Sequence, residues 1–355
     1  MGPLGRATTA ALVVILLTAS MGVCKARKES PQPRPPDLLL EGGRKLIYER
    51  SFSTEREAKG KPGFWGKLVD FVAGEAEVRG LVRPYSIAVD SRGRAIVTDP
   101  GARGVHVFDF ARKKYKFIER QEKRKDPMPA PQCVAVDAQD NIYVTDSQEG
   151  KIFVFNADGK FQRAIGSLRG GEGYFKRPTG IAVDSDSQRI FVTDTLRNKI
   201  YVLDFDGRVM KSFGQRGSGA GEFNYPTDLL LRGQDLAVVD AMNFRVQFLD
   251  LSGVVRDSIG SGGDASGDMF RPKGIGMDSE GHYYVVDALW GVVQVFDREG
   301  QLLYYFGKRG TGLGDFLLPT GLFIDRDDRV FVVDSFNRRI QVFRYFGVRA
   351  GVAKQ

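Results

Sequence analysis

The sequence predicts an all-β fold in which six repeated units of short strands close into a ring. A proline recurs at the start of each unit, with spacings of 47, 47, 48, 46 and 47 residues. Each proline is followed by short apolar runs separated by clusters of Gly, Asp and Asn, a pattern typical of strands joined by tight turns. A constant period of this length indicates a circular array of four-stranded sheets, which is a six-bladed β-propeller. The anchoring prolines are Pro84, Pro131, Pro178, Pro226, Pro272 and Pro319.

The strands within a unit are clearest in the third and sixth repeats. The third unit predicts strands over residues 181–184, 190–194, 200–203 and 209–213. The sixth predicts three, over residues 322–325, 330–334 and 340–343. These segments are rich in β-branched and aromatic residues, which favour strands. A sheet of four such strands cannot bury both faces alone, so we expect the sheets to stack radially and close into a ring.

The ring is expected to close through an N-terminal strand. The sixth unit lacks a fourth strand, whereas residues 45–53 have a strand pattern well before the first repeat. Ser51 and Phe52 in this segment match Ser212 and Phe213 at the end of the third unit. We therefore predict that residues 45–53 complete the last blade and that their removal destabilises the ring.

The loops between units share a further pattern of two glycines and a phenylalanine, followed by a Pro-Thr-Gly, Pro-Thr-Asp or similar step. It comprises Gly166, Gly173 and Phe175; Gly214, Gly221 and Phe223; and Gly307, Gly314 and Phe316. With these loops, roughly residues 45–346 resemble NHL repeats. The resemblance implies a six-bladed propeller. It leaves function open, because relatives bind proteins or RNA or act as sensors, and a lyase has a similar fold.

Three departures from the repeat pattern draw attention to particular blades. Arg232 replaces an aspartate that ends the first strand in the other five units, and Asp228 replaces a glycine. The loop between units one and two has no glycines. Such irregular blades are where we look for function, although free variation in loops is the simpler explanation.

The N-terminal residues predict export. Residues 1–23 combine one basic residue with a short apolar stretch, which is typical of a secretory signal. Two processing routes stay open: cleavage near Ser20–Gly22, or lipidation of Cys24 in a lipoprotein-like sequence. Residues 24–44 form a basic, Pro-rich stretch expected to act as a tether. We therefore expect an exported protein of the cell envelope, periplasmic or held on a membrane by its N-terminal anchor.

The rest of the chain divides around the repeats. Residues 54–82 form an insertion after the closing strand, in which residues 62–74 predict a short amphipathic helix. The repeats occupy residues 83–346, and residues 347–355 form a tail. Nothing in this organisation requires a second copy, so we expect a monomeric propeller.

The net charge of +8 is concentrated in one segment. Residues 111–125 contain eight basic side chains and two acidic ones. The export signal argues against nucleic acid as the partner, although basic stretches with aromatic residues can bind it. We interpret the segment as a lysine-protected edge strand with its following loop, and an acidic partner or anionic lipid as the alternative.

Three arginines form the candidate ligand site. Arg83, Arg177 and Arg271 each precede an anchoring proline, in units one, three and five. These units are a third of a turn apart, so their arginines should converge on one mouth of the central channel, with Tyr225 and Asp228 completing a polar rim. The planar guanidinium group suits carboxylate or phosphate. The alternative is that each arginine only stabilises its own loop.

Catalytic residues, a metal and a cofactor are not expected. The two histidines, His106 and His282, have no partners at metal-ligand spacing. An aspartate ends the second strand of each unit, and this recurrence indicates that its side chain caps the following turn. The predicted function is a binding or scaffolding module that uses its loop face to recognise an envelope protein or an anionic ligand. The alternative is a lyase- or lactonase-type enzyme at the channel.

Overall fold

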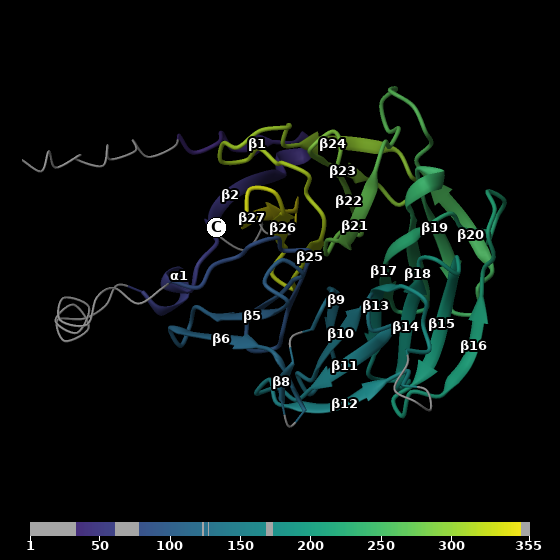
Figure 1. The fold of residues 1–355 in the computed structure, drawn as a ribbon. Helices are drawn as coiled ribbons and strands as arrows, with labels where there is room; N and C mark the ends of the chain where they lie inside the picture. The colour runs from purple at the N-terminus through teal and green to yellow at the C-terminus, as the bar shows by residue number, and fades with distance from the viewer. Residues whose placement is uncertain (1–32, 61–77, 123, 127, 168–172, 349–355) are drawn as a thin grey trace, which may run out of the picture. The chain divides into compact units, whose positions relative to one another are not determined.

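The computed structural model describes residues 33–60, 78–122, 124–126, 128–167 and 173–348. They form six antiparallel sheets around a central axis, five with four strands and one with five, and the predicted six-bladed propeller is confirmed (Figure 1). The predicted signal, Cys24 and the helix at residues 62–74 lie outside the described residues. Among the described residues, no helix has the length and apolarity that crossing a bilayer requires.

The blades follow one another along the chain, each running outward from the axis. Blade one contains β3 (Ser86–Val89), β4 (Ala95–Asp99), β5 (Gly104–Asp109) and β6 (Lys114–Ile118). Blade two contains β9 (Pro131–Val136), β10 (Ile142–Asp146), β11 (Lys151–Phe155) and β12 (Phe161–Ile165). Blade three contains β13 (Pro178–Asp184), β14 (Arg189–Asp194), β15 (Lys199–Asp204) and β16 (Val209–Phe213). Blade four contains β17 (Pro226–Arg232), β18 (Asp235–Asp240), β19 (Arg245–Asp250) and β20 (Val255–Ile259). Blade five contains β21 (Pro272–Met277), β22 (Tyr283–Asp287), β23 (Val292–Phe296) and β24 (Leu302–Phe306).

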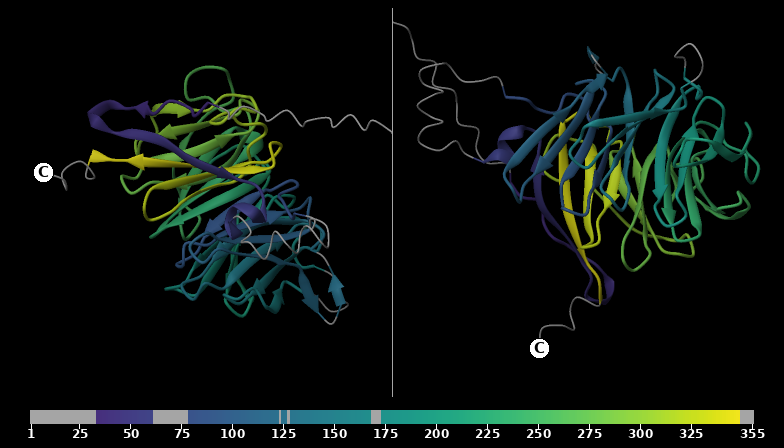
Figure 2. Two further views of the ribbon diagram at one scale, coloured as in Figure 1. Left: turned by 90° about the vertical axis from the view of Figure 1, so that its left-hand side faces the viewer. Right: turned by 90° about the horizontal axis from the view of Figure 1, so that it is seen from below.

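Blade six is built from both ends of the propeller. Its strands are β25 (Leu322–Ile324), β26 (Arg329–Asp334), β27 (Arg339–Phe346), β2 (Lys45–Phe52) and a short outer β1 (Leu38–Leu39). Figure 2 shows β2, in purple, beside the yellow β27, with which it pairs antiparallel. Phe52 lies opposite Ile340, as Phe213 lies opposite Ile200 in blade three, so the predicted closing strand is confirmed.

Smaller elements lie outside the blades. They are the helix α1 (Glu55–Lys59), the 3-10 turns η1 (Glu41–Gly43) and η2 (Ala241–Asn243), and a hairpin of β7 (Arg120–Glu122) and β8 (Arg124–Asp126). The basic segment at residues 111–125 thus includes the edge strand β6, as expected, and the hairpin, which was not predicted.

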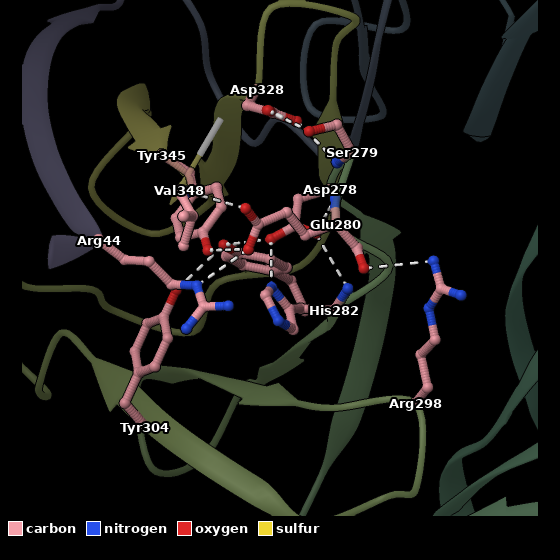
Figure 3. A network of polar contacts seen from close by, with 11 residues as sticks. Arg44, Asp278, Ser279, Glu280, His282, Arg298, Tyr304, Asp328, Tyr345 and Val348 are labelled. Atoms are coloured by element: carbon pink, nitrogen blue, oxygen red, sulfur yellow. Dashed lines mark hydrogen bonds and ion pairs between the residues drawn. The ribbon is translucent and has the colours of Figure 1, made fainter. Parts of the chain in front are cut away.

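Hydrogen bonds tie blade six to both of its neighbours. The Thr320 hydroxyl donates a hydrogen bond to the Tyr85 carbonyl at 2.7 Å, joining blades six and one beside the axis. On the other side, Glu280 of blade five accepts hydrogen bonds from Arg44, the Tyr345 hydroxyl and the Val348 backbone, each at 2.9 Å (Figure 3). The segments flanking the closing strand pair are therefore fastened to the adjacent blade.

The recurring aspartates have the expected capping role. Asp99 accepts backbone hydrogen bonds from Val82 and Arg83 at 2.7 and 2.9 Å. Asp194 accepts the same pair of bonds from Lys176 and Arg177. The corresponding carboxylates are Asp146, Asp240, Asp287 and Asp334. Each fixes the loop that precedes an anchoring proline, and so fixes the residues at the channel mouth.

Candidate anion-binding pocket at the channel mouth

The innermost strands β3, β9, β13, β17 and β21 all start near their anchoring prolines, so residues flanking these prolines surround one end of the axis. A pocket of about 670 Å³ opens there. Blades one to five contribute its lining, which includes Arg83, Tyr85, Gln132, Arg177, Thr179, Tyr225, Thr227, Met242, Arg271 and Lys273. The structure therefore brings together four of the five residues that the sequence suggested for a ligand site.

The three arginines reach the pocket without acidic partners. Their backbone N–H groups are held by the capping aspartates, while the side chains of Arg83, Arg177 and Arg271 are exposed. Among the described residues, none of the three guanidinium groups makes a hydrogen bond or an ion pair. Arg83 lies 5.3 Å from the centre of the Phe336 ring, which leaves its N–H donors available. For Arg177 and Arg271, the described residues show no side-chain hydrogen bond or ion pair that would stabilise their loops, whereas Arg83 contacts the Phe336 ring.

Lys273 adds a fourth positive charge that the sequence analysis missed. It follows Pro272 on β21 and is half-buried. Burial, with the nearby charges of Arg271 and Arg177, lowers the pKa of Lys273 to about 8. An anion that enters the pocket would stabilise the protonated form of Lys273. It would offset the cost of burying this charge and the repulsion from the two arginines.

Lys273 could have been identified from the sequence by comparing the residue that follows the anchoring proline in each blade. Thr227 and Thr320 stand at this position and donate hydrogen bonds to carbonyls of the next blade, at 3.4 and 2.7 Å. Thr179 holds the same position in blade three and lies 2.8 Å from the Thr193 hydroxyl. Blades one, two and five instead have Tyr85, Gln132 and Lys273. Comparing this position across repeats would have singled out three larger polar side chains, all of which line the pocket.

Asp228 lies beside the pocket and does not line it, which corrects its expected place on the rim. Its carboxylate is 3.9 Å from the Cys133 sulfur and accepts a hydrogen bond from the Leu229 backbone at 2.9 Å. Burial raises the pKa of Asp228 to about 7. Burial, together with the charge of Asp228, also raises the pKa of the Cys133 thiol well above its usual range. Cys133 is therefore a protonated thiol at neutral pH, unsuited to act as a nucleophile.

Glycine at position 180 allows the backbone of Asp228 to pack closely against blade three. A Cβ atom at Gly180 would lie 2.7 Å from the Asp228 Cα, because the inner strands of blades three and four approach closely. We expect Gly180→Ala to lower the free energy of unfolding by about 1–3 kcal/mol, as overpacking does. Urea unfolding checks this, with Gly219→Ala as the control, since that Cβ meets only the flexible Glu222 side chain. Equal stability of the two variants would contradict the prediction.

The other irregular residue, Arg232, lies at the opposite end of the inner strands. It lines a smaller pocket of about 300 Å³ with Asp90, Asp325 and Arg329. Arg329 is paired with Asp325 at 2.8 Å. Two aspartates face three arginines here, counting Arg326, in contrast to the channel mouth, which acidic side chains do not line among the described residues.

The histidines belong to structural networks away from the pocket. His106 is buried in blade one, within 2.8 Å of the Tyr115 hydroxyl and 3.4 Å of an Asp99 oxygen. His282 lies 2.8 Å from Asp278 in the network of Figure 3. Among the described residues, no group of three or more His, Cys, Asp or Glu side chains could hold a metal ion.

Comparisons with known proteins extend the fold assignment. A family described as a 6-bladed beta-propeller matches residues 132–188, 185–255 and 275–347, which together exceed half of the chain. No curated protein matches the sequence significantly. The narrower NHL assignment finds no match in these comparisons.

Solved structures with the same fold include enzymes and binding proteins. Virginiamycin B lyase from Staphylococcus aureus is similar with a TM-score of 0.55 and 14% identity, over 85% of this chain and 99% of that chain. An auxiliary nutrient binding protein from Bacteroides thetaiotaomicron gives 0.57 and 12%, over 75% and 70%. A protein of unknown function from the same organism gives 0.59 and 14%, over 89% and 84%. At these identities the similarity establishes the fold alone.

Proposed function

Because the chain belongs to the 6-bladed beta-propeller family, in which fold alone does not fix activity, we propose that it is a binding module for a small anion. The ligand site is the pocket at the channel mouth. One observation carries the proposal: Arg83, Arg177, Arg271 and Lys273 converge there, and no acidic side chain lines the pocket among the described residues. Unpaired cations that share a concave site repel one another, and a carboxylate or phosphate would relieve that repulsion.

The cellular setting is part of the same proposal. The signal-like residues 1–23 and the Pro-rich stretch at residues 24–44 support an exported propeller tethered to a membrane of the cell envelope. The loop pattern supports a closer relationship to NHL repeats, and an envelope protein is the other class of partner that a loop face of this kind suits.

The proposal is tested by removing two of the arginines together. We expect Arg177→Ala/Arg271→Ala to weaken binding of inorganic phosphate or citrate at least tenfold, since a hydrogen bond to a charged group contributes about 1.5–3 kcal/mol. Isothermal titration calorimetry measures the affinity, which should also fall as salt is added. The thermal midpoint should stay unchanged, because the two guanidinium groups have no partner among the described residues.

Arg112→Ala/Arg208→Ala is the matched control. It removes the same charge from exposed turns that follow the third strands of blades one and three, at the end away from the pocket. Equal affinity of the two double variants would refute the proposal. A large loss of thermal stability in the first variant alone would show that the pocket arginines are structural.

A lyase- or lactonase-type enzyme is the second candidate. The observation in its favour is Asp228, whose pKa of about 7 beside the pocket suits a group that exchanges protons at neutral pH. Turnover of a panel of lactones that disappears in Asp228→Asn, while phosphate still binds, would establish this candidate. The absence of turnover with intact anion binding would leave the binding module.

A further inference from the structure

The channel mouth carries exposed apolar side chains as well as cations. Tyr225, Met242 and Phe336 are 41%, 47% and 50% exposed. Tyr225 and Met242 line the pocket itself. Phe336 reaches it through its contact with Arg83, 5.3 Å from the guanidinium carbon to the ring centre. Large apolar groups beside a cationic pocket point to a ligand with two chemical parts.

The two kinds of side chain come from alternate blades. Blades one, three and five place an arginine before the anchoring proline, whereas blades four and six place Tyr225 and Leu318 there. The backbone differs accordingly, because Tyr225 and Leu318 have positive φ values of 57° and 47°. A left-handed residue other than Gly, Asn or Asp is uncommon and costs free energy. Glycine or asparagine would adopt this conformation more easily than tyrosine or leucine.

Local hydrogen bonds hold the apolar residues in place. The Tyr225 backbone N–H donates to the Asn198 side chain at 3.0 Å. The Met242 N–H donates to the Asn224 carbonyl at 3.0 Å, which fixes Met242 next to Tyr225. Phe336 is fixed in the same way, since its N–H donates to the Leu317 carbonyl at 3.1 Å. The apolar side chains are thus presented by ordered backbone at the channel mouth.

We infer that the pocket binds a small organic anion, a carboxylate or phosphate monoester whose acid group lies among the arginines and whose apolar substituent lies against Tyr225, Met242 and Phe336. This inference rests on the proposed anion-binding function and specifies its ligand class. A bare inorganic anion would leave the apolar side chains in water, whereas a substituted one covers them and gains from the hydrophobic effect.

The test compares two phosphate monoesters on the full-length protein by isothermal titration calorimetry. Hexyl phosphate should bind at least tenfold more tightly than methyl phosphate, because each methylene removed from water contributes up to about 0.8 kcal/mol. Met242→Ser/Phe336→Ser should reduce this ratio to near one, with the larger loss in the affinity for hexyl phosphate. The control is Val254→Ser/Tyr305→Ser, which removes two apolar side chains that are 61% and 62% exposed and do not line the pocket. That control should keep the preference.

The other outcomes contradict either the inferred ligand class or the anion-binding function as well. Equal affinity for the two esters refutes the apolar contribution and leaves the anion-binding function standing. A preference that survives Met242→Ser/Phe336→Ser also refutes the inference, because the apolar part then binds elsewhere. Failure of both esters to bind overturns the proposed function and the inference together. Flotation with phosphatidic acid vesicles, in the absence of hexyl phosphate binding, would show that the ligand is a membrane surface instead.

Discussion

Phe52→Ala is expected to lower the free energy of unfolding by about 3–5 kcal/mol, the range for removing a buried phenylalanine. Phe52 is 1% exposed and packs among Ile340, Val342 and Phe108, in the core between blades six and one. Its ring centre lies 5.0 Å from that of Phe108, in an edge-to-face arrangement. The substitution therefore leaves a cavity where the two ends of the propeller meet, and weakens the closure of the ring.

Urea unfolding followed by circular dichroism measures this effect. The midpoint should fall while the dependence on urea stays the same, as expected when stability changes without a change in the surface exposed. Tyr305→Ala is the control, because Tyr305 is an aromatic residue on the outer strand β24 but is 62% exposed. A Phe52 variant as stable as the Tyr305 variant would contradict a closing role for β2.

The closing strand was predictable because the sixth repeat lacks a fourth strand and residues 45–53 have a strand pattern outside the repeats. Repeats with anchoring prolines predict six equivalent sheets, and a unit that lacks one strand must obtain it from elsewhere. The match of Ser51 and Phe52 to Ser212 and Phe213 also indicates how β2 should pair with its neighbouring strand. A shift of this pairing by one residue would reverse which side chains are buried. The structure has this register.

The convergence of the arginines was predictable for the same reason, since equivalent positions in a ring of repeats face the same axis. Lys273 and Tyr85 were missed in the sequence analysis. They follow an anchoring proline, and the equivalent residues of blades four and six are threonines with a structural role. The burial of two glutamines was not predicted either: Gln247 and Gln341 are 1% and 0% exposed. Their amides donate to the Glu222 and Asp315 carbonyls, both at 2.7 Å. Only the path of the glycine-rich loops shows that these partners are present.

Asp228→Asn is expected to stabilise the protein above pH 7 and to leave it nearly unchanged near pH 4. Burial raises the pKa of Asp228 to about 7 in the folded protein, from 3.8 without that burial. Below about pH 4 the carboxyl is protonated in both the folded and the unfolded chain. As the pH rises towards 7, only the unfolded chain ionises freely, so the free energy of unfolding of the wild type falls. Three pKa units correspond to up to about 4 kcal/mol.

Urea unfolding at pH 4, 6 and 8 measures this dependence for the wild type, Asp228→Asn and the control Asp206→Asn. The control removes an aspartate whose side chain is 76% exposed and whose nearest cation is 4.0 Å away, so it should follow the wild type at every pH. A wild type that gains stability over Asp228→Asn as the pH rises would mean that the pocket cations keep Asp228 ionised.

The direction of this dependence also bears on the ligand. A bound anion brings negative charge close to Asp228 and further disfavours its ionised form. Binding of a phosphate monoester should therefore take up protons between pH 6 and 8, and its affinity should fall as Asp228 ionises. By linkage, Asp228→Asn should bind methyl phosphate with a weaker pH dependence than the wild type between pH 6 and 7, where Lys273, with a pKa of about 8, stays largely protonated, once the ionisation of the phosphate itself is subtracted. If Asp228 were held ionised by Lys273 and the arginines, the substitution would instead leave more positive charge unpaired and raise the affinity at every pH. Calorimetry of the two proteins in buffers of different ionisation enthalpy separates these cases.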